Sequence, residues 1–213
     1  MTDTDFVTAT RTFYDAIAED YADRFRDVFP AMPLDLAVLA GFAGLVGEGG
    51  EVADLGCGPG WTTAYLASRG LSVFGVDLSE AMLAIARREH PGLRFEQGSM
   101  LELALPDGAL AGVVSWYSTI HTPLDRLPDL FAEFRRVLAP GGHLLLGFQA
   151  GDEPRHHDRP FGRPVSLTFE RRRPEHVAGV LEDAGFRMVS RTVRAPDTEK
   201  GELVEQAFLI ARR

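Results

Sequence analysis

The chain has 213 residues, of which 45% are hydrophobic and 25% are charged, and its formal net charge is −9 at pH 7. This length predicts one domain that holds a core without disulfides or metals, and the composition is that of a globular protein rather than a disordered one. The acidic balance argues against a nucleic-acid surface, the single cysteine excludes an internal disulfide, and no phosphate-binding loop ending in Gly-Lys-Ser/Thr is present.

Helix-like and strand-like patterns alternate along the chain. In chain order the sequence predicts helices over residues 10–27 and 34–46, a strand over 51–55, a helix over 61–68, a strand over 71–76, a helix over 79–90, strands over 93–96 and 111–116, a helix over 124–138, a strand over 143–148, an irregular stretch over 151–173, a helix over 174–184, and strands over 186–193 and 203–211. This alternation predicts a mostly parallel sheet, whose last strand runs antiparallel because no helix precedes it. The loops after residues 55, 76, 96 and 116 are expected to line the ligand site, at the carboxyl ends of the strands.

Targeting and membrane signals are not visible in the sequence. Residues 1–20 are polar and acidic and lack the basic start and apolar run of a signal peptide. No stretch reaches the ~20 apolar residues of a membrane span. We therefore expect a cytoplasmic protein whose partners include neither membrane nor nucleic acid.

A glycine-rich turn follows the first predicted strand of the sheet. Residues 54–60 read Asp-Leu-Gly-Cys-Gly-Pro-Gly, and a dinucleotide-binding Gly-x-Gly-x-x-Gly motif would need its third glycine at position 61, which is Trp61. A second carboxylate, Asp77, ends the next strand, where it could accept both hydroxyl hydrogens of a ribose. That role also fits a nicotinamide cofactor, so Asp77 alone does not discriminate.

Together with Leu-Ala-Pro-Gly-Gly-His at residues 138–143, these features make the chain resemble the class I S-adenosylmethionine-dependent methyltransferases. The resemblance extends from Tyr14 to the last predicted strand. The resemblance implies a doubly wound, Rossmann-like α/β fold with a seven-stranded, mostly parallel sheet, a reversed last strand and helices on both faces. It implies a single methyltransferase domain over residues 1–213, with a helical cap over 1–47 and an insertion over 151–173 on the substrate side. It also implies S-adenosyl-L-methionine as cofactor, S-adenosyl-L-homocysteine as product, and no metal.

The resemblance assigns roles around the cofactor. The glycines would pass under its methionine and ribose, Asp54 would organise the methionine amino end, and Asp77 would hold the ribose hydroxyls. The family often places an acidic residue where this chain has Ser99, so adenine binding would depend on Ser99, Met100 or backbone. The cofactor set implied in this way is Asp54, Gly56, Cys57, Gly58, Gly60, Asp77, Leu78, Ser99, Met100 and Trp116.

Two tyrosines of the first helix complete that set. Tyr14 and Tyr21 lie on one face, two turns apart, and resemble the residues of a helix that many members of the family lay over the cofactor. Either phenol could bond the cofactor carboxylate; the alternative is that both belong to the core.

Candidate residues for the acceptor side follow the fourth sheet strand and fill the irregular stretch. His121 is the best candidate for a general base, because its ordinary pKa suits proton transfer, and the alternative is a structural histidine. Tyr117 is expected beside the acceptor. Arg155, Arg159 or Arg163 could pair with a carboxylate or phosphate of an anionic acceptor, or could form surface ion pairs.

The function that these patterns favour is methyl transfer to the oxygen or nitrogen of a small molecule. The sequence has no asparagine and so lacks the Asn form of the amino-methylating motif. Two alternatives stay open. One is a nicotinamide-dependent oxidoreductase, against which Trp61 argues, and the other is a non-catalytic protein that binds an adenosyl ligand.

Overall fold

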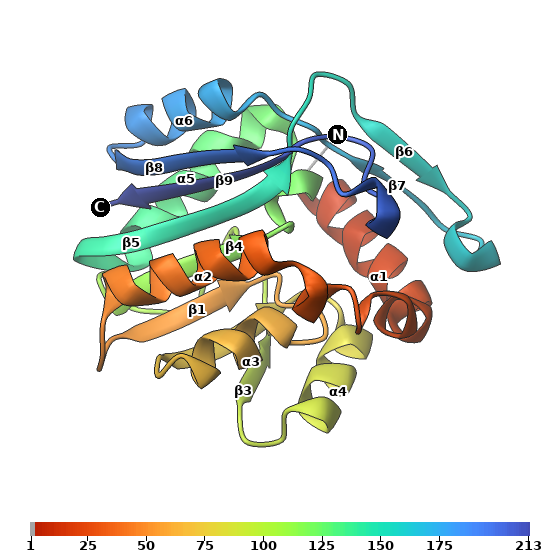
Figure 1. Ribbon diagram of the computed structural model, residues 1–213, viewed down its shortest axis with the longest axis horizontal. Helices are drawn as coiled ribbons and strands as arrows, with labels where there is room; N and C mark the ends of the chain where they lie inside the picture. The colour runs from red at the N-terminus through yellow and green to blue at the C-terminus, as the bar shows by residue number, and fades with distance from the viewer. Residues whose placement is uncertain (1–2) are drawn as a thin grey trace.

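The structure, a computed structural model, describes residues 3–213 (Figure 1). Within these residues, one sheet contains seven strands in the order β3-β2-β1-β4-β5-β9-β8. The first five run parallel, and β9 is antiparallel to both β5 and β8, so the predicted sheet with a reversed last strand is confirmed. The strands are β1 (Glu51–Leu55), β2 (Ser72–Asp77), β3 (Arg94–Gln97), β4 (Leu110–Trp116), β5 (Leu138–Gln149), β8 (Arg187–Arg194) and β9 (Gln206–Arg212).

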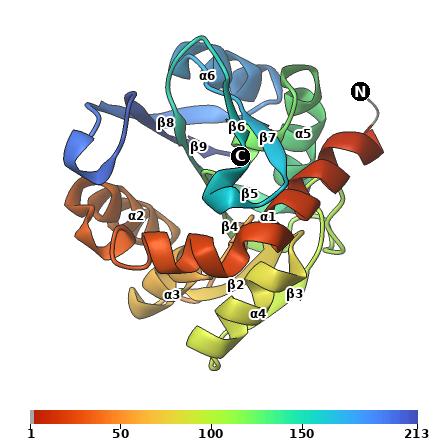
Figure 2. The ribbon, with the colours of Figure 1, turned by 90° about the vertical axis from the view of Figure 1, so that its right-hand side faces the viewer.

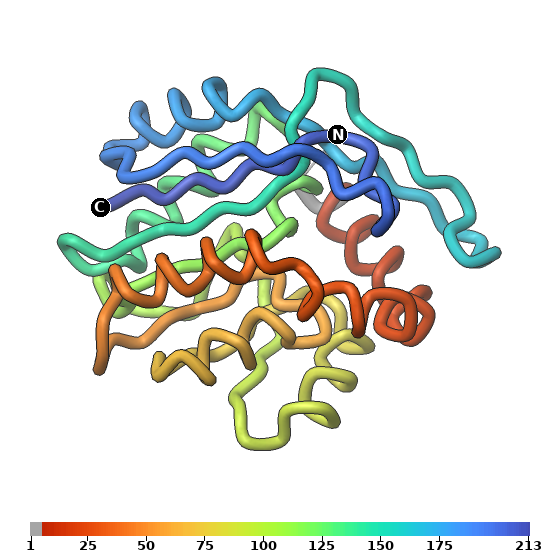
Figure 3. Tube along the Cα trace, viewed as in Figure 1, coloured from red at the N-terminus to blue at the C-terminus, as the bar shows by residue number. Residues whose placement is uncertain are grey.

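Helices cover both faces of this sheet. The six α-helices of the described chain are α1 (Asp3–Phe25), α2 (Pro33–Val46), α3 (Trp61–Ser68), α4 (Glu80–Glu89), α5 (Leu127–Val137) and α6 (Pro174–Asp183). Figures 1 and 3 show α2 and α3 on one face and α5 and α6 on the other. None of the helices in the described chain is long and apolar enough to cross a bilayer.

The core follows from the alternation of side chains along the strands, because consecutive residues point to opposite faces of a sheet. Val52 and Val114 pack with the apolar residues of α2 and α3, whereas their neighbours Ala53 and Val113 pack with those of α5 and α6. The helices match this pattern. In α5 the buried residues recur three and four positions apart, as a helix lying on a sheet requires: Leu127, Leu130, Phe131, Phe134 and Val137.

The carboxyl ends of the parallel strands are covered by two elements that the sequence places far apart (Figure 2). One is α1, which crosses this end of the molecule. The other is an antiparallel hairpin of β6 (Arg155–Asp158) and β7 (Ser166–Phe169). The prediction that residues 151–173 are irregular is therefore wrong, since a two-stranded sheet forms there despite the arginines and prolines.

Other differences concern the ends of elements. The fifth strand of the sheet begins at Leu138 instead of residue 143, because the Gly141-Gly142 turn is accommodated inside β5 with a shift of register against β4. The first helix begins by Asp3 instead of Thr10. The helix expected over residues 124–138 is divided into a 3-10 turn, Leu124–Arg126, and α5. The last strand begins at Gln206 instead of residue 203, after a loop that contains another 3-10 turn.

Candidate active site

The glycine-rich loop between β1 and α3 is held against the end of β2. Gly56 and Gly58 have positive φ angles of 75° and 53°, which L side chains rarely adopt. A Cβ on Gly56 would lie 2.2 Å from the Cβ of Ser118, so the close approach of these two loops requires glycine. The backbone N–H groups of Gly56 and Cys57 both donate to the carbonyl of Val76, at 2.7 and 3.1 Å. These two bonds fix the start of the loop against the end of β2.

Asp77 fixes the same loop from the end of β2. Its Oδ2 accepts a hydrogen bond from the Gly58 N–H at 2.8 Å, and its Oδ1 accepts one from the Ser79 N–H at 2.9 Å. Burial raises the pKa of Asp77 while these backbone donors lower it. Each carboxylate oxygen has a second lone pair, so two further donors can be accepted from the cavity that Asp77 lines.

Asp54 lies beneath the loop and is fully buried. The Thr63 hydroxyl donates to its Oδ2 at 2.6 Å, whereas its Oδ1 has no hydrogen-bond partner among residues 3–213. Burial raises the pKa of Asp54 to about 7, although the hydrogen bond from Thr63 opposes the shift. A buried carboxylate with one free oxygen is suited to a cationic ligand group, reached directly or through water.

This pKa predicts that the affinity for a ligand bearing an ammonium group depends on pH. Below about pH 7 Asp54 is protonated in the free protein, and a bound ammonium group favours the ionised form, so binding releases a proton. We expect the dissociation constant for S-adenosylhomocysteine to rise as pH falls from about 7 to 5, approaching tenfold per pH unit. Titration calorimetry over this range measures it. Asp54→Asn is expected to bind more weakly without the pH dependence, and an equally steep dependence in this variant contradicts the assignment.

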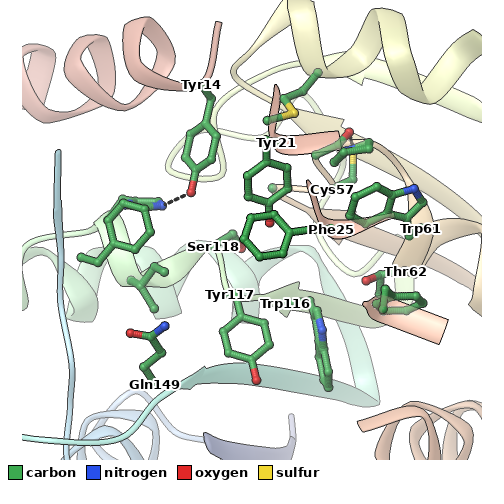
Figure 4. A pocket seen from close by; sticks show the side chains of 18 of the residues that line it. Tyr14, Tyr21, Phe25, Cys57, Trp61, Thr62, Trp116, Tyr117, Ser118 and Gln149 are labelled. Carbon is green, nitrogen blue, oxygen red and sulfur yellow. Dashed lines mark hydrogen bonds between the residues drawn. The ribbon is translucent and has the colours of Figure 1, made fainter. Parts of the chain in front are cut away.

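A cavity of about 390 Å³ opens above the loop, within the size range of small-molecule sites (Figure 4). On one side of it the Tyr14 hydroxyl lies 2.8 Å from Nε2 of His121, whose ring packs edge-on against Phe169 at 4.7 Å. Although both side chains keep some surface toward the cavity, desolvation lowers the pKa of His121 to about 3 and raises that of Tyr14 well above 10. The pair is therefore a neutral phenol joined by a hydrogen bond to a neutral imidazole.

Aromatic side chains form much of the remaining wall. Tyr21 stacks on Trp61, with ring centroids 6.3 Å apart, and Trp116 stacks on Phe208 at 5.0 Å. Tyr117 has a φ of 56°, a strained value for a bulky residue, and its N–H donates to the Gly147 carbonyl at 2.8 Å. These contacts hold a largely apolar chamber beside the loop.

The cavity brings together most of the predicted site residues. Those that line it are Tyr14, Tyr21, Gly56, Cys57, Gly58, Asp77, Leu78, Met100, Trp116, Tyr117, His121 and Arg155.

Five predicted residues do not line the cavity. Asp54 lies under the loop, and Gly60 packs on Phe95 at the start of α3. The Ser99 hydroxyl accepts a hydrogen bond from the Leu101 N–H at 3.2 Å within its own turn. Arg163 pairs with Asp20 of α1 at 2.8 Å, and Arg159 is exposed, with a positive φ at the tip of the hairpin. Neither arginine lines the cavity.

The lining residues that the sequence-based prediction missed include Arg11, Gln149, Phe169 and Arg171. The sequence contains a pattern that could have indicated two of them, Phe169 and Arg171. Residues 166–171 read Ser-Leu-Thr-Phe-Glu-Arg, an alternation that predicts a strand with Phe169 and Arg171 on one face.

Comparisons with known proteins give a consistent result. A family profile described as a methyltransferase domain matches residues 52–142. A trans-aconitate 2-methyltransferase of Methylobacterium nodulans is 40% identical over 112 residues, which are 50% of this chain and 41% of that protein. A malonyl-(acyl-carrier protein) O-methyltransferase of Pectobacterium atrosepticum is 35% identical over 108 residues, which are 50% of this chain and 40% of that protein. The chain thus spans about two fifths of the length of these curated relatives.

A solved structure resembles the whole chain. The 1,6-didemethyltoxoflavin-N1-methyltransferase of Burkholderia thailandensis, crystallised with 1,6-didemethyltoxoflavin and S-adenosylhomocysteine, superimposes with a TM-score of 0.72. The alignment covers 100% of this chain and 91% of that chain at 22% sequence identity, a likeness in fold.

Proposed function

We propose that this chain, which belongs to the class I S-adenosylmethionine-dependent methyltransferases, transfers a methyl group from S-adenosylmethionine to a small-molecule acceptor. The observation that carries the proposal is the glycine loop of residues 56–60 held on the Asp77 carboxylate, at the floor of a cavity of small-molecule size. When bound, the cofactor would supply a methyl group already activated on a sulfonium.

The residues of the site fit such a cofactor. Glycines at the loop let backbone approach a ligand closely, and Asp77 can accept two hydroxyl hydrogens of a ribose on its free lone pairs. The free Oδ1 of Asp54 suits the ammonium end of the methionine. Leu78 and Met100 line the cavity and supply apolar surface for the adenine, for which the Ser99 hydroxyl is not positioned.

The contribution of the protein to the transfer is positioning and exclusion of water. We assign the cover to α1, with Tyr14 and Tyr21 facing the cavity, and to the β6–β7 hairpin. Nε2 of His121 orients the Tyr14 hydroxyl in this arrangement. The general-base role of His121 stays a prediction. With a pKa of about 3 the imidazole is a weak proton acceptor, which favours an acceptor atom that needs no proton removed, such as a carboxylate oxygen or an uncharged amine.

The names of two relatives support an acidic acceptor. One is named as a methyltransferase of trans-aconitate and the other as a methyltransferase of malonyl-(acyl-carrier protein), and both of these acceptors carry a carboxyl group. We therefore propose a small acceptor with an anionic group.

Titration calorimetry with S-adenosylmethionine, S-adenosylhomocysteine and NADH tests the cofactor assignment. We expect both adenosyl ligands to bind and NADH not to bind, since Trp61 stands where a dinucleotide site needs glycine. Binding of NADH alone contradicts the proposal. Binding of the adenosyl ligands without S-adenosylhomocysteine formation from any of a panel of small carboxylic acids, phenols and amines favours a non-catalytic binding protein instead.

A further inference from the structure

We infer that Arg155 and Arg171 form an anion subsite, which binds a carboxylate or phosphate group of the acceptor on the hairpin side of the cavity. That the bound anion is the methyl acceptor rests on the proposed function. The subsite itself follows from the hairpin, its charges and its unpaired groups.

The hairpin and the residues after it bring the two arginines to the cavity. Arg155 in β6 is paired with Phe169 in β7, and side chains two apart on a strand share a face, so Arg155, His157 and Phe169 point the same way. Arg171 follows two residues after the end of β7. All four line the cavity. The intervening Arg172 points away and donates to the carbonyls of Thr119 and Thr122. Of these two neighbouring arginines, Arg171 is therefore the one on the cavity side.

The cavity contains more unpaired positive charge than negative charge. Two of its acidic residues, Asp35 and Glu202, are both paired with Arg194. By contrast, no carboxylate of the described chain lies within ion-pair distance of Arg155 or Arg171. Nε of Arg171 is buried and has no hydrogen-bond partner within residues 3–213. A buried donor of a charged group without a partner is costly, which is the condition that an anionic ligand would relieve.

The groups around the two arginines are suited to the same ligand. Burial chiefly lowers the pKa of His157, and the nearby charges of Arg155 and Arg171 lower it further, so this ring is a neutral hydrogen-bonding partner. Gln149, whose Oε1 is also without a partner among the described residues, lies on the opposite side of the cavity from Cys57 of the glycine loop (Figure 4). The Gln149 carbonyl accepts a hydrogen bond from the Arg172 N–H at 3.2 Å, which places the Gln149 backbone beside the segment that carries Arg171.

Guanidinium geometry decides the class of ligand. The planar fork of arginine donates two parallel hydrogen bonds to a carboxylate or a phosphate, and such charge-assisted bonds are the strong ones. Phe169, the cross-strand partner of Arg155, also lines the cavity and offers apolar surface for the carbon frame of a small acid.

Calorimetric titration with citrate and, separately, with inorganic phosphate tests the subsite, on the free protein and on protein saturated with S-adenosylhomocysteine. We expect at least one of these anions to bind, and Arg171→Gln to weaken that binding about tenfold or more. Arg155→Gln, at an exposed position that does not endanger the fold, is expected to act in the same direction. Arg163→Gln is the charge-matched control, since that arginine of the same hairpin pairs with Asp20 outside the cavity. It is expected to leave anion binding unchanged.

Three results overturn the inference. The first is that neither anion binds. The second is that the Arg171 and Arg155 variants bind anions with the affinity of the unaltered protein. The third is that Arg171→Gln weakens the binding of S-adenosylhomocysteine as strongly as it weakens the binding of citrate. The last result would mean that the guanidinium holds the carboxylate of the cofactor. Failure of the unaltered protein to bind S-adenosylhomocysteine is a failure of the proposed function instead, and the titrations of the free protein then still decide the subsite.

Discussion

Asp77→Ala is expected to weaken S-adenosylhomocysteine binding by about 1.5–3 kcal/mol, which is about 10- to 150-fold in the dissociation constant. Two losses contribute. The ribose hydroxyls lose a charged acceptor, and the glycine loop loses the Oδ2 that holds the Gly58 N–H at 2.8 Å. Calorimetry measures the affinity, and thermal unfolding of the free protein shows how much the loop itself has changed.

A matched control for this prediction is Asp23→Ala. Asp23 is an exposed carboxylate of α1 that pairs with Arg26 and does not line the cavity. Its removal changes the net charge by the same amount and is expected to leave the affinity for S-adenosylhomocysteine unchanged. Equal affinities of the Asp77 variant and the unaltered protein refute the ribose assignment.

Arg194→Met is expected to lower the free energy of unfolding by about 3–5 kcal/mol, the range for breaking a buried ion pair. Arg194 ends β8 and is 9% exposed. It donates to Asp35 of α2 at 3.1 Å and to Glu202 of the loop before β9 at 2.7 Å. Methionine fills a similar volume but leaves both carboxylates without their cation. Since Asp35 and Glu202 line the cavity, the loss also loosens one of its walls.

Urea denaturation of Arg194→Met and Arg191→Met separates this effect from a general effect of removing an arginine. Arg191 lies in the same strand and pairs with Glu182 at 3.2 Å, but both side chains are largely in solvent. Exposed pairs contribute about 1 kcal/mol or less, so this variant is expected to unfold near the midpoint of the unaltered protein. Similar midpoints for the two variants contradict a stabilising role for the buried cluster.

The fold and the cofactor side could be predicted because both depend on local spacing. The positions of Gly56, Gly58 and Asp77 follow from where β1 and β2 end, and strand ends are marked by turns in the sequence. The parallel order of the sheet follows from the alternation of helices and strands. These features can be predicted without knowing which segments, distant in the sequence, are in contact in the fold.

The acceptor side depends on contacts between segments that are far apart in the sequence, and these contacts are harder to predict. Burial lowers the pKa of His121, and two of the residues that contact its ring, Tyr14 and Phe169, are 107 and 48 positions away. The ordinary pKa of histidine, on which the general-base prediction was based, therefore does not apply to His121. Arg163 was proposed for the acceptor from its place in an arginine-rich stretch, but the hairpin directs it to α1, while Arg171 of the same stretch faces the cavity. Composition identified the stretch, but which of its arginines face the cavity depends on how the stretch folds over α1 and the sheet.

A crystal structure of the protein with S-adenosylhomocysteine tests the account most directly. The account predicts that both ribose hydroxyls lie within hydrogen-bond distance of the Asp77 carboxylate, over the loop of residues 56–60. It also predicts that the cofactor sulfur faces the chamber that Tyr14, Tyr117 and Arg171 line. A ligand whose ribose lies away from Asp77, or whose sulfur faces away from that chamber, contradicts it.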